Sequence, residues 1–247
     1  MKPDPALDLD RRKFLGVAAA AVLVMSPRFA AAAEGAGGRL KIGVIGSGRI
    51  GGTVGGLWVK AGHEVMFSAR EIDEVKPLVA SLGPLARAGT PREAAAFGEV
   101  VLISVPYRVL PELGRDLAAE LKGKAVLETG NPYPSRDGDM AVPARAKGTG
   151  VASAEFLPGV RLVRAFNSVG YSWLRSEAHR AGERVAIPLA ADDEAALKLA
   201  MRLVEEAGFE PVAVGRLARA KEFDVGTAVY GKALTARELR AGLGISR

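Results

Sequence analysis

Residues 41–70 read KIGVIGSGRIGGTVGGLWVKAGHEVMFSAR and contain a pattern of alternating elements that recurs along the chain. The short apolar run at 42–45 is typical of a buried parallel strand. Three glycines follow it at the spacing G-x-G-x-x-G, and a helical pattern then continues to a glycine at residue 62. A second strand is predicted at 64–67. Strand, glycine turn, helix and strand together make a βαβ unit of about thirty residues.

The three glycines have separate physical roles in such a unit. Gly46 lets the chain turn out of the strand, Gly48 leaves room for a pyrophosphate beside the backbone, and Gly51 lets the helix pack close to the sheet. The first N–H groups of the helix have no intrahelical partner, so they favour an anion. We therefore predict a dinucleotide-binding turn. The alternative is a glycine-rich loop in an ordinary α/β domain.

The end of the second strand indicates which dinucleotide binds. NAD sites usually carry an acidic residue there, whereas this chain has Ser68 and Arg70. A carboxylate about 4 Å from a 2′-phosphate would cost on the order of 1–4 kcal/mol, and a hydroxyl with a guanidinium would attract that phosphate instead. The pattern predicts NADP(H), with a solvated arginine at the strand end as the alternative.

Composition excludes several classes of site. The 247 residues include no cysteine, which excludes disulfides, iron–sulfur clusters and thiolate zinc sites. The two histidines, His63 and His179, are far apart and are expected to be turn or surface residues, so no metal site is predicted. The net charge of +6 suits anionic ligands. Because the basic residues are scattered and form no recognisable motif, no nucleic-acid partner is expected.

The first 33 residues are predicted to be a signal peptide of the twin-arginine type. Arg11 and Arg12 precede an apolar stretch at 15–25, which is too short to span a bilayer at about 20 residues. The following small residues allow cleavage near Ala32 or Ala33. This pattern predicts export by the twin-arginine machinery and a periplasmic location. An uncleaved membrane anchor or a chance N-terminal helix is the alternative.

Beyond the glycine turn, strand and helix patterns keep alternating. Strands are predicted at 85–88, 100–105, 125–128, 161–166, 185–190 and 211–214. Helices are predicted at 75–82, 91–96, 110–121, 193–207 with Asp192 as its N-cap, 223–234, and 235–243 capped by Thr235. The alternation predicts an α/β fold with a doubly wound, mostly parallel sheet (a Rossmann fold) and a small C-terminal α/β extension. We expect a linker at 34–39, an NADP-binding domain at 40–157 and the smaller C-terminal part at 158–247.

The ordered segments VIGSGRIGGTVGGLWVKAGHEVMFSAR, VLISVPYRVL, LETGNPY and RAFNSVG resemble the NADP oxidoreductases that use the deazaflavin coenzyme F-420. The resemblance covers residues 40–217 and implies an enzyme that binds NADP(H). It also implies a homodimer in which the C-terminal end of the chain contacts the second subunit, as in members of that family. By this resemblance, the pyrophosphate lies at Gly46, Ser47, Gly48, Arg49, Ile50 and Gly51, the 2′-phosphate at Ser68 and Arg70, the ribose and nicotinamide at Ser104, Val105 and Pro106, and the reaction pocket at Asn131 and Asn167.

The chemistry expected of this site is hydride transfer between NADP(H) and a second redox cofactor or acceptor of deazaflavin, flavin or ferric type. Direct transfer asks the protein for positioning rather than for a side-chain base, and the sequence offers no obvious catalytic histidine or cysteine. No catalytic residue is therefore assigned, and Tyr107 is expected to pack against its loop. One alternative is a non-catalytic NADP-binding sensor or carrier. Another is a β-hydroxyacid-dehydrogenase-like or imine-reducing enzyme, but residues 161–214 leave too little chain for the long helical domain of such enzymes.

Overall fold

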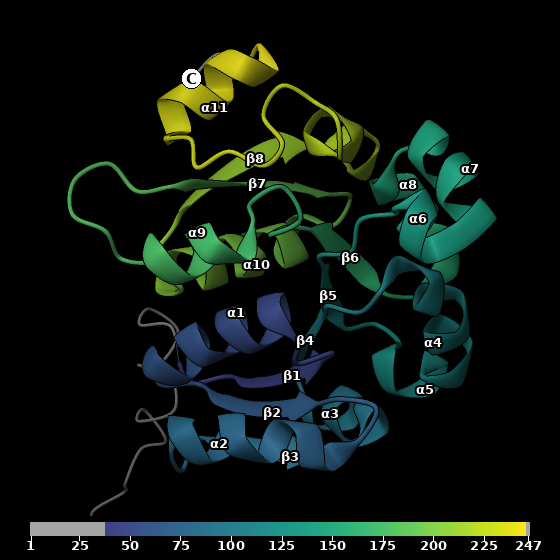
Figure 1. Cartoon of the computed structure of the whole chain (residues 1–247), viewed down its shortest axis with the longest axis vertical. Helices are drawn as coiled ribbons and strands as arrows, with labels where there is room; N and C mark the ends of the chain where they lie inside the picture. Colours follow the sequence, from purple (N-terminus) through teal and green to yellow (C-terminus); the bar gives the residue numbers. More distant parts are fainter. Residues whose placement is uncertain (1–37, 246–247) are drawn as a thin grey trace, which may run out of the picture. The chain divides into compact units, whose positions relative to one another are not determined.

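The protein is built on one eight-stranded sheet in the order β3-β2-β1-β4-β5-β6-β7-β8 (Figure 1). The computed structural model describes residues 38–245, so the predicted signal peptide and most of the predicted linker lie outside the described residues. No helix of the described part has the length and apolar character needed to cross a membrane. The strands are β1 (Lys41–Ile45), β2 (Glu64–Ser68), β3 (Ala86–Gly89), β4 (Val100–Ile103), β5 (Ala125–Glu128), β6 (Arg161–Arg164), β7 (Ala186–Ala191) and β8 (Glu210–Gly215).

Neighbouring strands are parallel throughout the sheet except for β6 and β7, which are antiparallel. The central strands are short apolar runs such as VVLI in β4, as expected where helices cover both faces of a parallel sheet. The predicted fold class, a doubly wound and mostly parallel α/β sheet, is confirmed. The helices are α1 (Arg49–Lys60), α2 (Lys76–Leu82), α3 (Pro91–Phe97), α4 (Leu110–Asp116), α5 (Ala118–Leu121), α6 (Pro134–Asp137), α7 (Ala141–Lys147), α8 (Thr149–Phe156), α9 (Tyr171–Ser176), α10 (Glu194–Glu206) and α11 (Ala236–Leu243).

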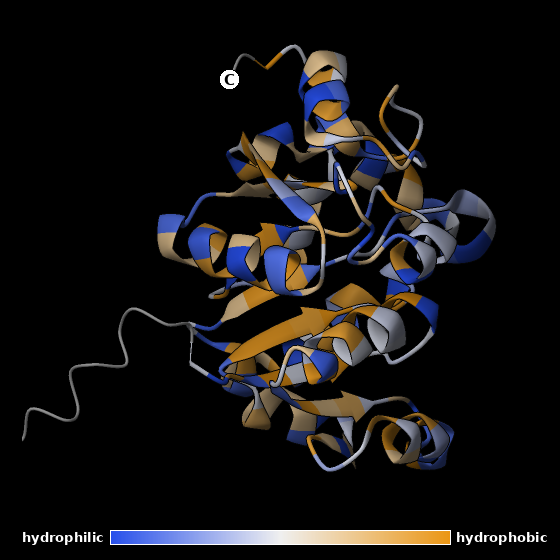
Figure 2. Cartoon of the chain, turned by 90° about the vertical axis from the view of Figure 1, so that its left-hand side faces the viewer, coloured by the Kyte–Doolittle hydropathy of each residue, from blue (hydrophilic) through white to orange (hydrophobic). Residues whose placement is uncertain are grey.

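Each face of the sheet has its own apolar core, because successive side chains of a strand point to opposite faces. On one face, Val44 belongs to the cluster that includes Trp58 of α1 and Leu203 of α10. On the other face, Ile45 belongs to the cluster formed with α3, α4 and α8. The indole N–H of Trp58 also donates to the Leu203 carbonyl at 2.8 Å, which ties α1 to α10 across the first core. Figure 2 shows the apolar colour concentrated on the central strands, with hydrophilic residues on the helices around them.

The loops that contribute to the functional site begin at one edge of the sheet. The last residues of β1, β4, β5 and β6 are in register, so the loops after them begin side by side. β7 runs the opposite way and therefore begins at this edge, where Val185 pairs with Thr235. The N–H of Gly231 donates to the Ser168 carbonyl at 2.7 Å. These two contacts bring the C-terminal segment 224–235 beside the loop that follows β6.

Several predicted elements need correction. The predicted helix at 223–234 is wrong: a 3-10 helix (η4, Leu217–Phe223) ends there, and glycines 226 and 231 with φ of +94° and +75° turn the chain afterwards. The predicted helix at 110–121 is divided into α4 and α5 at Leu117. Residues 134–156, for which no element was predicted, form α6, α7 and α8.

Two local predictions also change. The N-cap of α10 is Asp193, whose carboxylate accepts the Ala196 N–H at 2.7 Å, whereas Asp192 accepts from Arg216 instead. His63 is buried and lies 2.8 Å from the Glu206 carboxylate, so it is a core residue rather than an exposed turn residue. The Thr235 cap of α11 is confirmed and forms a full capping box.

Candidate functional site

The glycine turn between β1 and α1 is shaped by two close backbone approaches. Gly46 has φ of +90°, and a Cβ built on it would lie 2.3 Å from the Ser104 carbonyl oxygen. A Cβ on Gly51 would lie 2.1 Å from the Gly46 carbonyl oxygen. Gly48 is different, because a Cβ there meets no atom of the described chain within 4 Å. Packing therefore accounts for two of the glycines, while the third borders open space at the start of α1.

The N-terminus of α1 presents unpaired donors to that space. Gly48 is its N-cap, no side chain caps it, and no acidic residue lies in its first turn. The first i→i−4 bond of the helix runs from Gly52 to Gly48 at 2.8 Å, so the N–H groups of residues 49–51 precede it. The Ser47 hydroxyl is buried without a hydrogen-bond partner among the residues that the structure describes. The open space beside Gly48, the N–H groups of residues 49–51 and the buried Ser47 hydroxyl together fit a pyrophosphate.

The two residues expected at the 2′-phosphate differ in accessibility. Arg70 is exposed directly after β2. Ser68 is fully buried and its hydroxyl donates to the Val44 carbonyl at 2.9 Å, so it holds β2 to β1 rather than facing a ligand. The expected role of the Ser68 hydroxyl is thus corrected. The Ser68 carbonyl instead accepts the N–H groups of Gly46 and Ser47, at 3.1 and 2.9 Å, and helps to fix the turn.

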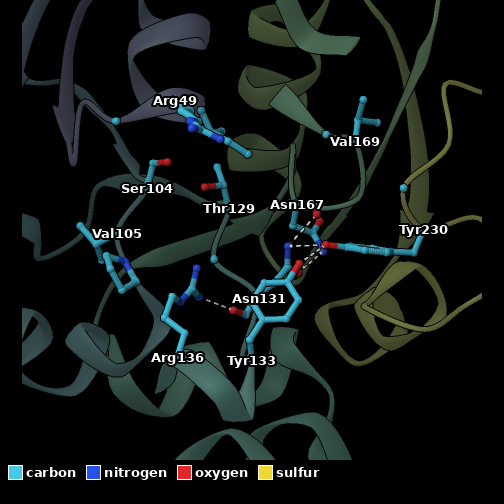
Figure 3. A pocket seen from close by; sticks show the side chains of 16 residues that line it. Arg49, Ser104, Val105, Thr129, Asn131, Tyr133, Arg136, Asn167, Val169 and Tyr230 are labelled. Carbon is cyan, nitrogen blue, oxygen red and sulfur yellow. Dashed lines mark hydrogen bonds between the residues drawn. The ribbon is translucent and has the colours of Figure 1, made fainter. Parts of the chain in front are cut away.

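A cavity of about 440 Å³ continues from this turn along the carboxyl edge of the sheet (Figure 3). It lies between the glycine turn, the loops after β4, β5 and β6, and the C-terminal segment. Eight of the residues predicted from the sequence line it together: Gly48, Arg49, Ile50, Ser104, Val105, Pro106, Asn131 and Asn167. The other predicted residues, Gly46, Ser47, Gly51, Ser68 and Arg70, do not line it. Tyr107 is buried away from it, and its hydroxyl lies 3.0 Å from Ser153 Oγ, as expected of a packing residue.

Asn167 reaches the cavity because the backbone turns sharply at the end of β6. The preceding residue, Phe166, has φ of +60°, a conformation that costs on the order of 1–3 kcal/mol for a bulky side chain. Its fully buried ring is held edge-on between Trp58 and Phe209, at centroid distances of 6.2 and 6.3 Å. Such strain, fixed by packing, is typical of functional sites.

The orientation of the Asn167 amide is set by two acceptors. Its Nδ2 donates to Asn131 Oδ1 and to Asp224 Oδ1, both at 3.4 Å. The Asn167 Oδ1 is buried and has no partner in the described part of the chain. Asp224 is held in turn by the backbone N–H of Thr149 at 2.8 Å. The site therefore contains an oriented amide oxygen ready to accept a hydrogen bond from a ligand, such as one from a carboxamide.

The lining residues that were not identified from the sequence include Tyr133, Arg136 and Tyr230. The hydroxyls of Tyr133 and Tyr230 are hydrogen-bonded to each other, although 97 positions separate them in the chain. Arg136 donates to the Asn131 carbonyl at 2.6 Å, and its guanidinium lies 5.1 Å from the centroid of the Tyr133 ring. Tyr133 lies just past β5 in the quoted LETGNPY segment and could have been noted there. Tyr230 lies in the segment 223–234 that was predicted to be a helix, so its approach to Tyr133 was not expected.

A buried ion pair supports the loop after β5. Glu128 and Arg164 are both fully buried, and Arg164 Nη1 donates to the Glu128 carboxylate. Ser153 Oγ and the Gly130 N–H also donate to this carboxylate, the former at 2.8 Å. Arg164 Nη2 donates to the Gly130 carbonyl at 2.7 Å. The pair fixes Gly130 from both sides and so positions Asn131 beside the cavity.

The described residues contain no cluster of histidine, cysteine or acidic side chains that could hold a metal ion. The exposed Arg49 guanidinium lies 4.9 Å from the centroid of the Tyr171 ring, at the start of α9. A cation is therefore held next to the glycine turn without an acidic partner among residues 38–245, which again suits a phosphate ligand.

The structure resembles several solved proteins at low sequence identity. A hypothetical protein from Sinorhizobium meliloti aligns with a TM-score of 0.70 at 20% identity, over 80% of this chain and 96% of its own. A candidate F420-dependent NADP reductase from Arthrobacter aligns with a TM-score of 0.64 at 20% identity, over 79% and 99% of the two chains. An imine reductase from Myxococcus stipitatus with bound NADP⁺ aligns with a TM-score of 0.53 at 20% identity, over 74% of this chain but only 57% of its own. These similarities establish the fold.

A similarity to one family comes from the sequence. No curated protein sequence matches the chain. Residues 41–132, which run from β1 through β5 and include the glycine turn, match the family described as NADP oxidoreductase, coenzyme F420-dependent. The resemblance noted in the sequence is thereby confirmed over this segment, and the match supports an NADP-dependent oxidoreductase.

Proposed function

We propose that the protein transfers a hydride between NADP(H) and a second, ring-shaped redox acceptor of deazaflavin or flavin type. The observation that carries the proposal is the single cavity of about 440 Å³, which joins the open Gly48 cradle to the amide and tyrosine side chains after β5 and β6. A volume of this size is typical of small-molecule sites. It offers a phosphate site at one end and an oriented set of polar groups at the other.

The residues of the chain have distinct parts in this proposal. NADP(H), when bound, supplies or takes up the hydride. The N–H groups at the start of α1 would hold the pyrophosphate, and Arg70 would attract the 2′-phosphate. Val105 and Pro106 give the cavity an apolar wall that excludes water from the transfer, while Asn131 and Asn167 orient ligand amides or carbonyls.

Oxidation of NADPH in the presence of a panel of acceptors tests the proposal. Purified protein is mixed with NADPH and, separately, with a 5-deazaflavin, a flavin and a ferric chelate, and the NADPH absorbance is followed. We expect turnover with the deazaflavin or the flavin. Tight NADPH binding without oxidation by any acceptor would instead identify a non-catalytic sensor or carrier.

The choice of NADP(H) rests on Arg70 and has its own test. Arg70→Ala should weaken NADPH binding by about 1.5–3 kcal/mol, the magnitude of a charge-assisted hydrogen bond, or roughly 10- to 150-fold in Kd. NADH binding should hardly change, because NADH lacks the 2′-phosphate. Equal losses for both nucleotides in a calorimetric titration would show that Arg70 does not meet the phosphate.

We further propose that the protein is exported through the twin-arginine pathway. The support is the pattern of Arg11, Arg12, the apolar stretch 15–25 and the small residues that precede Ala33, all outside the described residues. Cell fractionation with N-terminal sequencing should find a chain beginning near residue 33 or 34 outside the cytoplasm. Retention of the Arg11→Lys, Arg12→Lys variant in the cytoplasm is expected, and normal export of that variant would contradict the proposal.

A further inference from the structure

The hydrogen-bonded pair Tyr133–Tyr230 lies in the cavity wall on the side away from the glycine turn (Figure 3). The two hydroxyls bond to each other. Asn131 Nδ2 donates to Tyr230 Oη at 3.3 Å, and the same nitrogen donates to the Asn167 carbonyl at 2.8 Å. The pair is thus fixed by the two asparagines that belong to the proposed reaction pocket.

The Tyr133–Tyr230 pair has one phenolic proton that is not used within the pair. Each phenol has one O–H to donate, and Asn131 has already taken an acceptor position on Tyr230. The bond between the two hydroxyls uses one of the two protons. Neither hydroxyl has another acceptor in the described part of the chain. One phenolic O–H is therefore left to donate, whichever tyrosine carries it.

Burial favours the neutral form of Tyr230, and a guanidinium lies beside the pair. Burial, together with the bond to Tyr133, raises the pKa of Tyr230 well above its ordinary value. Asp224 acts in the same direction, whereas Arg136 opposes it. Arg136 also lies over the Tyr133 ring, where its cation stabilises negative charge developing on that phenol. The pair therefore lies beside the guanidinium of Arg136, which is itself ion paired with Asp137.

Resting on the proposed function, we propose that the Tyr133–Tyr230 pair is the proton donor of the reaction. The acceptor is then a molecule that takes a proton on a nitrogen or oxygen atom as it takes the hydride on carbon, such as a conjugated ring nitrogen, an imine or a carbonyl. One-electron ferric acceptors have no such atom and do not use the pair.

The proposed step transfers one hydride and one proton to the acceptor. The acceptor gains a C–H bond from the hydride and its two electrons, and a pair of electrons moves to the acceptor heteroatom. That heteroatom forms a bond to the proton as the phenolic O–H bond breaks. The phenolate that is left is stabilised by Arg136 and by the neighbouring hydroxyl until solvent returns a proton. Oxidised nucleotide and doubly reduced acceptor are the products.

The test uses phenylalanine substitutions, which remove only a hydroxyl, in the full protein with NADPH and 5-deazariboflavin. Tyr133→Phe and Tyr230→Phe should each lower kcat by roughly tenfold, and the double variant should lower it by about 10²-fold or more, the scale of general acid catalysis. The control is Ser176→Ala, which removes an exposed hydroxyl outside this cavity and should keep the wild-type rate. NADPH affinity should stay within about threefold in every variant, because the pair does not contact the phosphates.

The pH profile distinguishes proton donation from mere positioning. Wild-type kcat should be flat from about pH 6 to 9, while that of the double variant should fall roughly tenfold per pH unit because the proton must come from solvent. A solvent deuterium isotope effect on wild-type hydride transfer, measured without any substitution, should accompany this. Full activity of the double variant, or parallel pH profiles with no solvent isotope effect, would overturn the proton-donor role while leaving hydride transfer intact. A wild-type protein that oxidises no NADPH with any acceptor would overturn the proposed function itself.

Discussion

Replacing Gly48 with valine separates nucleotide binding from folding at a single position. A Cβ at this residue meets nothing within 4 Å in the protein alone, and its backbone, with φ of −71° and ψ of −154°, is extended and suits a β-branched residue. The folded protein should therefore accept the side chain. The loss of an N-cap glycine costs about 1 kcal/mol, which lowers Tm by roughly 2–4 °C for a chain of this size.

Nucleotide binding should suffer far more than stability. The valine methyl groups would fill the open space above the start of α1, which is where a pyrophosphate would approach the N–H groups of residues 49–51. Losing two charge-assisted hydrogen bonds at about 1.5–3 kcal/mol each gives about 3–6 kcal/mol, or roughly 10²- to 10⁴-fold in Kd. NADPH and NADH should be affected alike, because both carry the pyrophosphate.

Calorimetric titration of the two nucleotides together with thermal unfolding measures both quantities. Gly56→Ala in the same helix is the matched control, since its Cβ would make only an ordinary contact of 3.5 Å with Leu82. That variant should gain about 1 kcal/mol of helix stability and bind NADPH normally. If Gly48→Val binds NADPH as the wild type does, the nucleotide does not lie over the start of α1.

Other consequences can be tested through stability. Arg164→Met should lower the free energy of unfolding by about 3–5 kcal/mol in denaturant titrations, because it leaves the buried Glu128 carboxylate without its cation. The double variant Glu128→Met, Arg164→Met should recover most of that loss, and no recovery would argue against the ion-pair explanation. Gly51→Ala should destabilise the fold more than Gly48→Val does in thermal unfolding, since its Cβ would lie 2.1 Å from a carbonyl oxygen; equal stability of the two variants would contradict this. Burial raises the pKa of Asp137, but hydrogen bonds from Arg136 and from two backbone N–H groups outweigh it and bring the pKa below its ordinary value of 3.8. The stability that the Asp137 carboxylate supplies is therefore fully present above pH 3.8 and is lost as the pH falls through the lower pKa of the folded protein. In denaturant titrations at acidic pH, the free energy of unfolding of Asp137→Asn should depend less on pH than that of the wild type. An unchanged dependence would exclude Asp137 as the source of the acid sensitivity.

The periodic and local features of the sequence were sufficient to predict most of the sheet. Apolar runs such as 100–103 and 125–128 give strands because a residue covered on both faces must be apolar. The capping box of α11 is equally local, since Thr235 and Glu238 lie three residues apart. The helix expected at 223–234 does not form, because glycines 226 and 231 turn the chain.

The sequence alone determined the βαβ unit, the nucleotide class and one half of the cavity, because a strand, a glycine turn and a helix N-terminus are formed by neighbouring residues. Only the tertiary structure decided which side chains face a ligand. It buried Ser68 against β1, and it brought Tyr230 to Tyr133 across 97 positions by running β7 antiparallel to β6. Contacts between distant segments depend on strand order and direction, and these are set by packing over the whole sheet rather than by any local pattern.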